Sequence, residues 1–149
     1  MNKKILIIIL ILLLPGCGYE SIYVKNYENF SIKNFTIEEP NQITNKIKRA
    51  LLKNSKPSGE IISINLKSKK NKVITAKDSR GYPLTFKMSV QIDIMLTKDK
   101  ENFKKIFLND FSYNNRNNQF DLKQYENDVE GILINKSTQD ILLFITSNK

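Results

Sequence analysis

A strict alternation of apolar and polar residues between Leu84 and Leu96 constrains the fold more than any other feature of the sequence. Every second residue in this stretch is apolar, and the residues between them are polar with the single exception of Met95. A period of two places alternate side chains on opposite faces of a β-strand. The pattern therefore predicts a long antiparallel strand with one buried face and one solvated face.

Three other segments have the shorter or less regular alternation of strands. Phe30–Ile37 predicts a strand with an irregularity near Asn34, and Glu60–Lys69 predicts a half-buried strand. Phe103–Tyr113 is predicted to pair back onto the long strand. Lys70–Gly81 is polar and basic, and we interpret it as a turn region that can carry extensions of the flanking strands.

Two segments have apolar residues at helical spacing. Asn41–Asn54 places lysines opposite its apolar face, with Asn41 in the position of an N-cap. After an asparagine-rich loop, the apolar stripe of Phe120–Ser147 predicts a long closing helix despite Gly131 in its interior. Two such helices can cover only one face of a sheet. We therefore predict an α+β two-layer sandwich, with two amphipathic helices on one face of a mainly antiparallel sheet of about four strands. The other face is expected to be polar or to meet a partner.

The beginning of the chain has the form of a secretory signal. Lys3 and Lys4 precede an unbroken apolar run over residues 5–14. This run is shorter than the roughly 20 apolar residues that a membrane-spanning helix needs. It is followed at once by Cys17, which is the only cysteine in the sequence.

The segment Leu14-Pro15-Gly16-Cys17 resembles the bacterial lipobox, although Pro15 is unusual within that pattern. In a lipobox the cysteine sulfur is acylated, the peptide is cut before the cysteine, and the new amino group is acylated too. We expect removal of residues 1–16. Residues 17–149 would then form a single domain, held on a membrane by diacylglyceryl and acyl (palmitate) lipid on Cys17.

The composition disfavours an enzyme. The sequence has no histidine, and lipidation of Cys17 would leave no free thiol, so the usual general base, metal ligands and cysteine nucleophile are missing. The carboxylates of Asp110, Glu126 and Asp128 are the remaining candidates for a catalytic pair. Nothing in the sequence brings them together, and Glu126 and Asp128 lie two apart on a helix, facing different ways. We predict no catalytic site, no metal and no cofactor.

The chain is basic, with a net charge of +9 that falls to +7 when Lys3 and Lys4 leave with the signal peptide. A positive surface favours partners that carry phosphate or carboxylate groups. Lysine, asparagine and isoleucine are all abundant, however, which indicates a general compositional bias behind much of this charge. Nucleic acid is not an expected partner, because the protein is predicted to be secreted and has no recognised binding motif.

Taken together, the sequence resembles the LptE family of lipopolysaccharide-assembly lipoproteins, most closely its alphaproteobacterial branch. The resemblance rests on the order and spacing of short motifs across nearly all of the mature chain. These are Gly16-Cys17-Gly18-Tyr19 with Tyr23, Arg49-Ala50-Leu51-Leu52, the long strand after Tyr82, and Phe111-Ser112-Tyr113-Asn114 leading to Phe120, Glu126 and Asp128.

The resemblance implies a binding and structural role. LptE-like proteins plug the large β-barrel LptD, assist its assembly and bind lipopolysaccharide on its way to the outer leaflet. The residue after Cys17 is Gly18 and not the aspartate that, by the common sorting rule, would retain a lipoprotein in the inner membrane. The outer membrane is therefore the expected location.

The family's lipopolysaccharide-binding residues can be carried over to two places in this sequence. A basic residue in the loop between the middle strands falls on Arg80, with Lys77 as the alternative, and a lysine near the start of the last helix falls on Lys123. Lys69, Lys70 and Lys72 could extend this basic tip. A competing interpretation is a lipoprotein adaptor or inhibitor that acts on another envelope complex.

Overall fold

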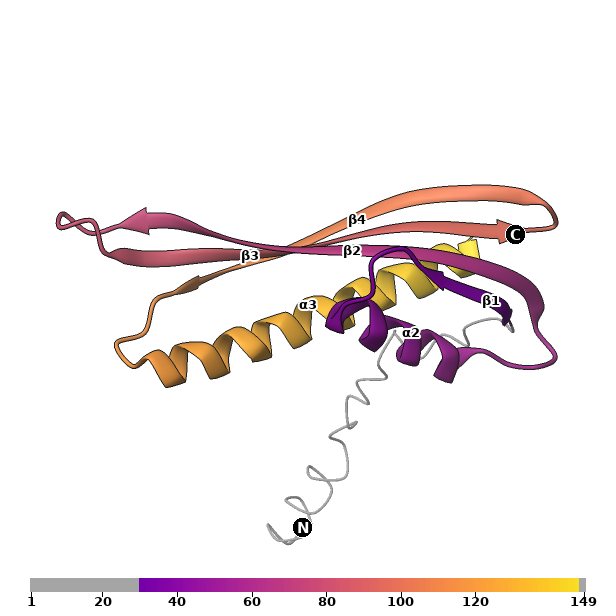
Figure 1. Cartoon of the computed structure of the whole chain (residues 1–149), viewed down its shortest axis with the longest axis horizontal. Helices are drawn as coiled ribbons and strands as arrows, with labels where there is room; N and C mark the ends of the chain where they lie inside the picture. The colour runs from indigo at the N-terminus through magenta and orange to yellow at the C-terminus, as the bar shows by residue number, and fades with distance from the viewer. Residues whose placement is uncertain (1–29, 148–149) are drawn as a thin grey trace, which may run out of the picture.

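The computed structural model describes residues 30–147, which form a sheet and two helices in the order that the sequence predicted (Figure 1). The elements are β1 (Phe30–Ile37), α2 (Gln42–Asn54), β2 (Glu60–Lys77), β3 (Pro83–Lys98), β4 (Glu101–Asn114) and α3 (Gln119–Ser147). The predicted signal peptide and Cys17 lie outside the described residues.

The four strands form a mixed sheet in the order β1-β2-β3-β4. β1 runs parallel to β2, while the β2–β3 and β3–β4 pairs are antiparallel. A parallel pair needs a crossover connection, and α2 supplies it between β1 and β2. The register of β1 shifts between Ile32 and Asn34, which confirms the predicted irregularity near Asn34.

Both helices lie on the same face of the sheet, which confirms the predicted two-layer α+β architecture (Figure 1). Alternate residues of β3 from Phe86 to Leu96 are buried beneath the helices, as the period of two predicted. Leu84 continues this pattern but is 49% exposed, because the β2–β3 hairpin extends beyond the helix layer at this end (Figure 1).

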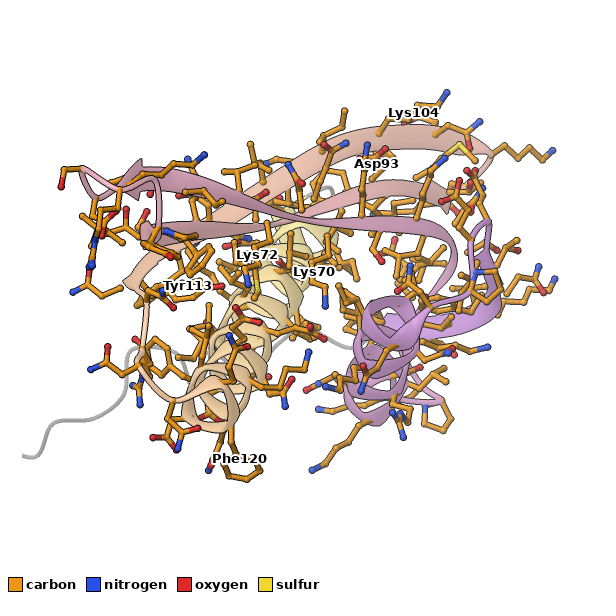
Figure 2. All side chains as sticks on the ribbon, turned by 60° about the vertical axis from the view of Figure 1, so that its left-hand side comes forward. Lys70, Lys72, Asp93, Lys104, Tyr113 and Phe120 are labelled. Carbon is orange, nitrogen blue, oxygen red and sulfur yellow. The ribbon has the colours of Figure 1, made fainter. Side chains whose placement is uncertain are left out.

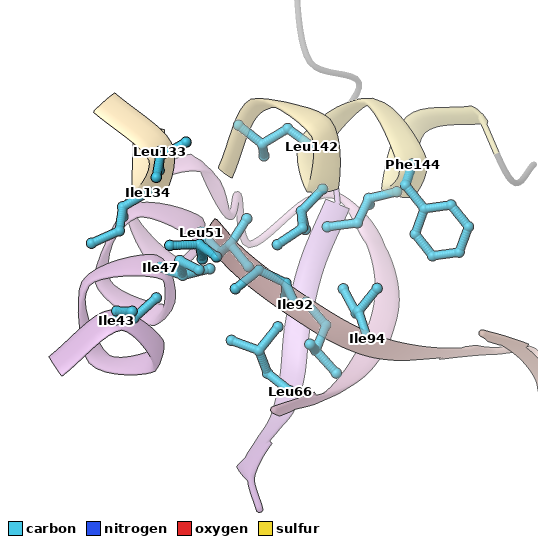
Figure 3. Packing of buried hydrophobic residues seen from close by; sticks show 14 of the residues in the cluster. Ile43, Ile47, Leu51, Leu66, Ile92, Ile94, Leu133, Ile134, Leu142 and Phe144 are labelled. Atoms are coloured by element: carbon cyan, nitrogen blue, oxygen red, sulfur yellow. The ribbon is translucent and has the colours of Figure 1, made fainter. Parts of the chain in front are cut away.

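The core lies between the sheet and the two helices. Ile47 and Leu51 of α2 and Ile92 of β3 are completely buried there. Figure 3 shows these residues meeting side chains of α3 such as Leu133 and Leu142. Complete burial of each aliphatic side chain stabilises the fold by about 1.5–3 kcal/mol, which makes this contact the main attachment of the helices to the sheet.

Asn41 fixes both the start of α2 and its position on the sheet. Its Oδ1 atom accepts hydrogen bonds from the backbone N–H groups of Ile43 at 2.9 Å and Thr44 at 3.0 Å. The Thr44 hydroxyl accepts one from the Asn41 backbone N–H at 3.0 Å, which completes a capping box. The Asn41 amide also donates to the Ser68 carbonyl at 3.2 Å, and the Ser68 hydroxyl donates back to Asn41 at 3.0 Å. The predicted N-cap is therefore confirmed, and it also joins α2 to β2.

The segment after Lys69 is mostly strand rather than turn. β2 continues to Lys77, paired with β3 from Lys70 opposite Val90 to Lys77 opposite Pro83. The turn itself occupies only residues 78–82 between the two strands. The long alternating strand supplies pairing partners along its whole length, and these hold the polar half of β2 in extended form.

The sheet face opposite the helices is mixed rather than purely polar. Lys67, Asp93 and Lys104 lie there, and Figure 2 shows the last two pointing away from the helix layer. Between the charges, Ile106 and Leu108 of β4 are 65% and 64% exposed. The prediction of a solvated face therefore holds for β3, whereas β4 presents apolar side chains on it.

Candidate ligand-binding site

The turn between β2 and β3 is held in one shape by Asp78. Its Oδ1 atom accepts hydrogen bonds from the backbone N–H groups of Arg80 and Tyr82, both at 2.9 Å. Its backbone N–H donates to the Tyr82 carbonyl at 2.9 Å, and its carbonyl accepts from the Gly81 N–H at 3.0 Å. Gly81 has a φ of 87°, a left-handed conformation that glycine adopts without strain. The turn therefore holds the backbone beneath Arg80 in a defined conformation.

Arg80 lies at the tip of this hairpin and is open to solvent. Its side chain is 79% exposed, with Nε 3.6 Å from the nearer carboxylate oxygen of Asp78. The guanidinium carbon lies 5.5 Å from the centre of the Tyr82 ring, within the range of a cation–π contact. These contacts engage only part of a group that has five N–H donors. The remaining donors can bind an anionic oxygen, and a guanidinium binds phosphate with two parallel hydrogen bonds.

The structure brings Lys77 and Arg80 together in the same hairpin tip, since Lys77 is the exposed last residue of β2. Lys123 is exposed in the first turns of α3. Figure 1 shows that the hairpin tip and the start of α3 lie at the same end of the molecule. The three predicted lipopolysaccharide-binding residues therefore share one end of the fold, with Lys123 on a separate element.

Lys70 and Lys72 do not extend this basic tip, so that expectation was wrong. Both residues lie on the helix-facing side of β2, where Lys70 pairs with Glu130 and Lys72 with Glu126 of α3. Figure 2 shows the two lysines between the sheet and α3. Their charges are neutralised in the interface, whereas Lys69, which lies opposite Gln91, faces the other side of the sheet.

Glu126 is the centre of a polar network between β2, β4 and α3. It accepts hydrogen bonds from the Lys72 ammonium and from the Tyr113 hydroxyl, the latter at 3.0 Å. Burial alone would raise the pKa of Glu126, but the hydrogen bonds from Lys72 and Tyr113 outweigh it, and the pKa lies below its usual value. Burial and the bond to Glu126 raise the pKa of Tyr113. Lys72 also lies 4.2 Å from the centre of the Phe86 ring.

The sequence contains a signal for this network that the first interpretation missed. Lys70 and Lys72 are two residues apart on a strand, so their side chains leave the same face. Glu126 and Glu130 are four apart on a helix and also share a face. Two matched pairs of opposite charge on elements that pack together predict interlayer ion pairs rather than a ligand site.

The carboxylates considered for catalysis are not assembled into a pair. Asp110 lies on the outer face of the sheet, 3.3 Å from the Lys87 ammonium. Glu126 lies on the opposite side, between the sheet and α3, and Asp128 is exposed on α3. Between residues 30 and 147 no cluster of three or more potential metal ligands is found.

A hollow with a volume of about 520 Å³ lies on the outer sheet face. Its charged lining residues are of both signs, among them Glu38, Lys67, Asp93 and Lys104. Lys67 pairs with Glu39 at 2.7 Å, and the Asn65 amide donates to Glu38 at 2.8 Å. Much of its polar lining is therefore already paired within the chain.

Neither helix of residues 30–147 is long and apolar enough to cross a membrane. No protein family matches the sequence in a profile comparison, and no curated protein matches it significantly.

Solved structures of lipoproteins share the fold. Rare lipoprotein B from Shewanella oneidensis matches with a TM-score of 0.59 at 13% identity, over 80% of this chain and 94% of that chain. Lipoprotein B from Nitrosomonas europaea matches with a TM-score of 0.54 at 16% identity, over 80% of this chain and 81% of that chain. A minor lipoprotein from Acinetobacter baumannii matches with a TM-score of 0.52 at 12% identity, over 78% of this chain and 94% of that chain. The chain therefore has the fold of the rare lipoprotein B structures, the LptE-type fold that its sequence resembles.

Proposed function

We propose that this chain is a lipid-anchored protein of the outer membrane that plugs and helps to assemble an LptD-type β-barrel and binds lipopolysaccharide during its delivery to the outer leaflet. The observation that carries the proposal is the β2–β3 hairpin, which extends beyond the helix layer and presents Arg80 at its tip (Figure 1). The shared fold of the rare lipoprotein B structures supports it.

The chemistry of the tip suits a phosphorylated glycolipid. Arg80 offers a planar donor group for bidentate binding of phosphate, and Lys77 adds a second positive charge on the same hairpin. Exposed apolar side chains lie close in sequence on the same hairpin, where Tyr82 is 63% and Ile74 45% exposed. A ligand with both phosphate and acyl groups can use both kinds of contact.

The outer face of the sheet fits the proposed place inside a barrel. The lumen of a large outer-membrane barrel is polar, so a protein inside it must offer hydrogen-bonding side chains. The outward side chains of β3 include Lys87, Gln91 and Asp93, all of which lie on the face away from the helices. Contacts of this outer face with a barrel would leave the core undisturbed, because the core lies on the other face of the sheet, beneath the two helices.

The first experiment tests the barrel. The full chain is purified from outer membranes in mild detergent, and the proteins that accompany it are identified and quantified. A large β-barrel in a stoichiometric complex is the expected result. Recovery of the chain without a barrel would contradict the plug proposal and favour an adaptor or inhibitor of another envelope complex.

The second experiment tests the ligand. Binding of purified lipopolysaccharide to the full chain is compared between Arg80→Glu and the matched control Arg49→Glu, which changes an exposed arginine of α2. Loss of a charge-assisted, bidentate contact is expected to weaken binding about tenfold or more in the Arg80 variant only. An equal effect of both variants would show that net charge, rather than the hairpin tip, determines binding.

A further inference from the structure

The outer edge of β4 lacks two of the common protections of an edge strand. β4 is the last strand of the sheet, and within residues 30–147 no strand pairs with its outer edge. It pairs with β3 from Glu101 to Asn114 without a register shift, and it contains no proline. Bulges and prolines are two common devices that prevent edge strands from pairing with other chains. Their absence leaves a long row of backbone groups available to another strand.

Apolar side chains lie beside this edge on the outer face of the sheet. Ile106 and Leu108 are 65% and 64% exposed, and no charged residue stands between Ile106 and Asn109 in the sequence. Single exposed apolar residues are common on protein surfaces. A neighbouring pair on an edge strand whose remaining protection is charged side chains, such as Lys104 and Lys105, marks a candidate site for association if those charges find partners.

The outer face of β4 is complementary to itself. In an antiparallel pair of two β4 strands with the twofold axis at Phe107, Lys104 of each copy stands opposite Asp110 of the other. Ile106 of each copy stands opposite Leu108 of the other. Side chains directly opposite each other in adjacent strands are close enough to interact, so this register makes two ion pairs and two apolar pairs on one face.

The helix-facing side of the same register is also compatible. Phe103 stands opposite Phe111, which is 37% exposed in the single chain. Lys105 stands opposite Asn109, so no two like charges oppose each other.

Neighbouring registers do not have this complementarity. An axis at Ile106 places Lys104 opposite Leu108, and an axis at Leu108 places it opposite Ser112. A shift that changes the pairing by a single residue turns the side chains of one copy to the wrong face of the sheet. The sequence therefore specifies the register at Phe107.

We propose that β4 is a self-association edge, through which two copies of this chain join as antiparallel strands centred on Phe107 and extend the sheet across the pair. Asp110 already pairs with Lys87 at 3.3 Å, but its side chain remains 42% exposed and can accept a second cation. This inference concerns the chain free of a barrel, and it does not depend on the proposed barrel or on lipopolysaccharide.

The test is a charge swap measured by sedimentation velocity on the purified full chain in non-ionic detergent, over a range of concentrations. Wild type is expected to form dimers. Lys104→Asp and Asp110→Lys each place like charges opposite each other twice, and each is expected to weaken dimerisation about tenfold. The matched control Lys33→Asp changes an exposed lysine on β1, at the other edge of the sheet, and is expected to dimerise as wild type does.

Mixing the two variants provides the decisive measurement. A Lys104→Asp copy and an Asp110→Lys copy are complementary in this register, so their equimolar mixture is expected to recover the wild-type affinity, as is the double variant. A monomer at every concentration, as expected if a strand of another protein occupies the edge, would overturn the proposal. So would a dimer that the single swaps do not weaken or that mixing does not restore.

Discussion

The hydroxyl of Tyr113 on β4 donates a hydrogen bond of 3.0 Å to the carboxylate of Glu126 on α3, so the last strand and the last helix are joined by a partly buried polar contact. The Tyr113 ring also packs edge-on against Tyr125, with the ring centres 5.8 Å apart. The strand and the helix are thus joined by polar and aromatic contacts at the end of the molecule that carries the candidate binding site.

Tyr113→Phe removes the hydroxyl and keeps the ring. Glu126 then loses one of its two side-chain hydrogen bonds, and we expect the free energy of unfolding to fall by about 1–2 kcal/mol. Urea denaturation measures the change. Tyr82→Phe is the matched control, since Tyr82 is 63% exposed and should lose almost nothing. Equal stability of Tyr113→Phe and wild type would mean that the bond adds nothing to the fold.

Glu126 should make stability depend on acid. The pKa of Glu126 in the folded chain is below the usual value, whereas its pKa in the unfolded chain is about 4.3. Between the two pKa values the unfolded chain binds a proton that the folded chain does not. The stabilising contribution is therefore complete above the unfolded pKa and is lost as the pH falls through the folded pKa.

Glu126→Gln is expected to remove this part of the pH dependence, so that its unfolding free energy changes less between about pH 5 and pH 3 than that of wild type. Denaturant midpoints at several pH values provide the measurement. Asp128→Asn, at an exposed neighbouring site, should keep the wild-type slope. An unchanged slope in Glu126→Gln would assign the acid sensitivity to other carboxylates.

In the Lys70–Glu130 ion pair, removing one charge should cost more stability than removing both, because one partner is buried. The side chain of Glu130 is only 9% exposed, while that of Lys70 is 45% exposed. Lys70→Met leaves the carboxylate without its partner and is expected to cost about 1–2 kcal/mol of unfolding free energy. Adding Glu130→Met should recover part of that loss, because both charges are then absent. A double variant less stable than Lys70→Met would show that the carboxylate has other stabilising partners.

Asn41→Ala tests the cap of α2. The substitution removes the acceptor of the Ile43 and Thr44 N–H groups and the contact with Ser68, with an expected loss of about 1–2 kcal/mol. Thermal unfolding followed by circular dichroism provides the measurement. Asn45→Ala, on an exposed face of the same helix, serves as control. If both variants lost similar stability, the capping hydrogen bonds of Asn41 would contribute nothing beyond the general effect of replacing asparagine by alanine.

Cys17→Ser tests the proposed anchor. We expect the purified variant, free of any barrel, to bind lipid vesicles much more weakly than the wild-type protein, because several acyl chains are needed for stable attachment. Mass spectrometry of the wild-type protein should find lipid on residue 17 and no trace of residues 1–16. A wild-type chain that keeps its first residues would rule out processing at this site.

The helix-facing pattern of β3 could be predicted from sequence because burial alone determines it. The same holds for α2, where an asparagine before an apolar stripe specifies both the start and the orientation of the helix. The second half of β2 could not be predicted in this way. Its inward positions are Lys70 and Lys72, whose partners Glu130 and Glu126 are about 60 and 54 residues away in the chain.

The candidate site was located by resemblance rather than by local pattern. Arg80 has no periodicity around it that marks a ligand site, and only the resemblance separated it from the other basic residues. What the structure adds is the support beneath it, the Asp78 turn and the Tyr82 ring. These contacts depend on a turn conformation that the sequence Asp-Ser-Arg-Gly-Tyr does not specify by itself.

The parallel pairing of β1 with β2 also determines how far the basic tip lies from Phe30, the first described residue after the proposed lipid anchor. Phe30 lies beside Glu60 at the start of β2, whereas the hairpin begins after Lys77, roughly 55 Å further along the strand. Under the proposed anchoring, Cys17 is thirteen residues before Phe30, so covalent geometry limits the distance between these two residues to about 45 Å. Arg80 therefore lies at the end of the domain that is remote from Phe30. There it can bind a ligand far from the proposed point of attachment.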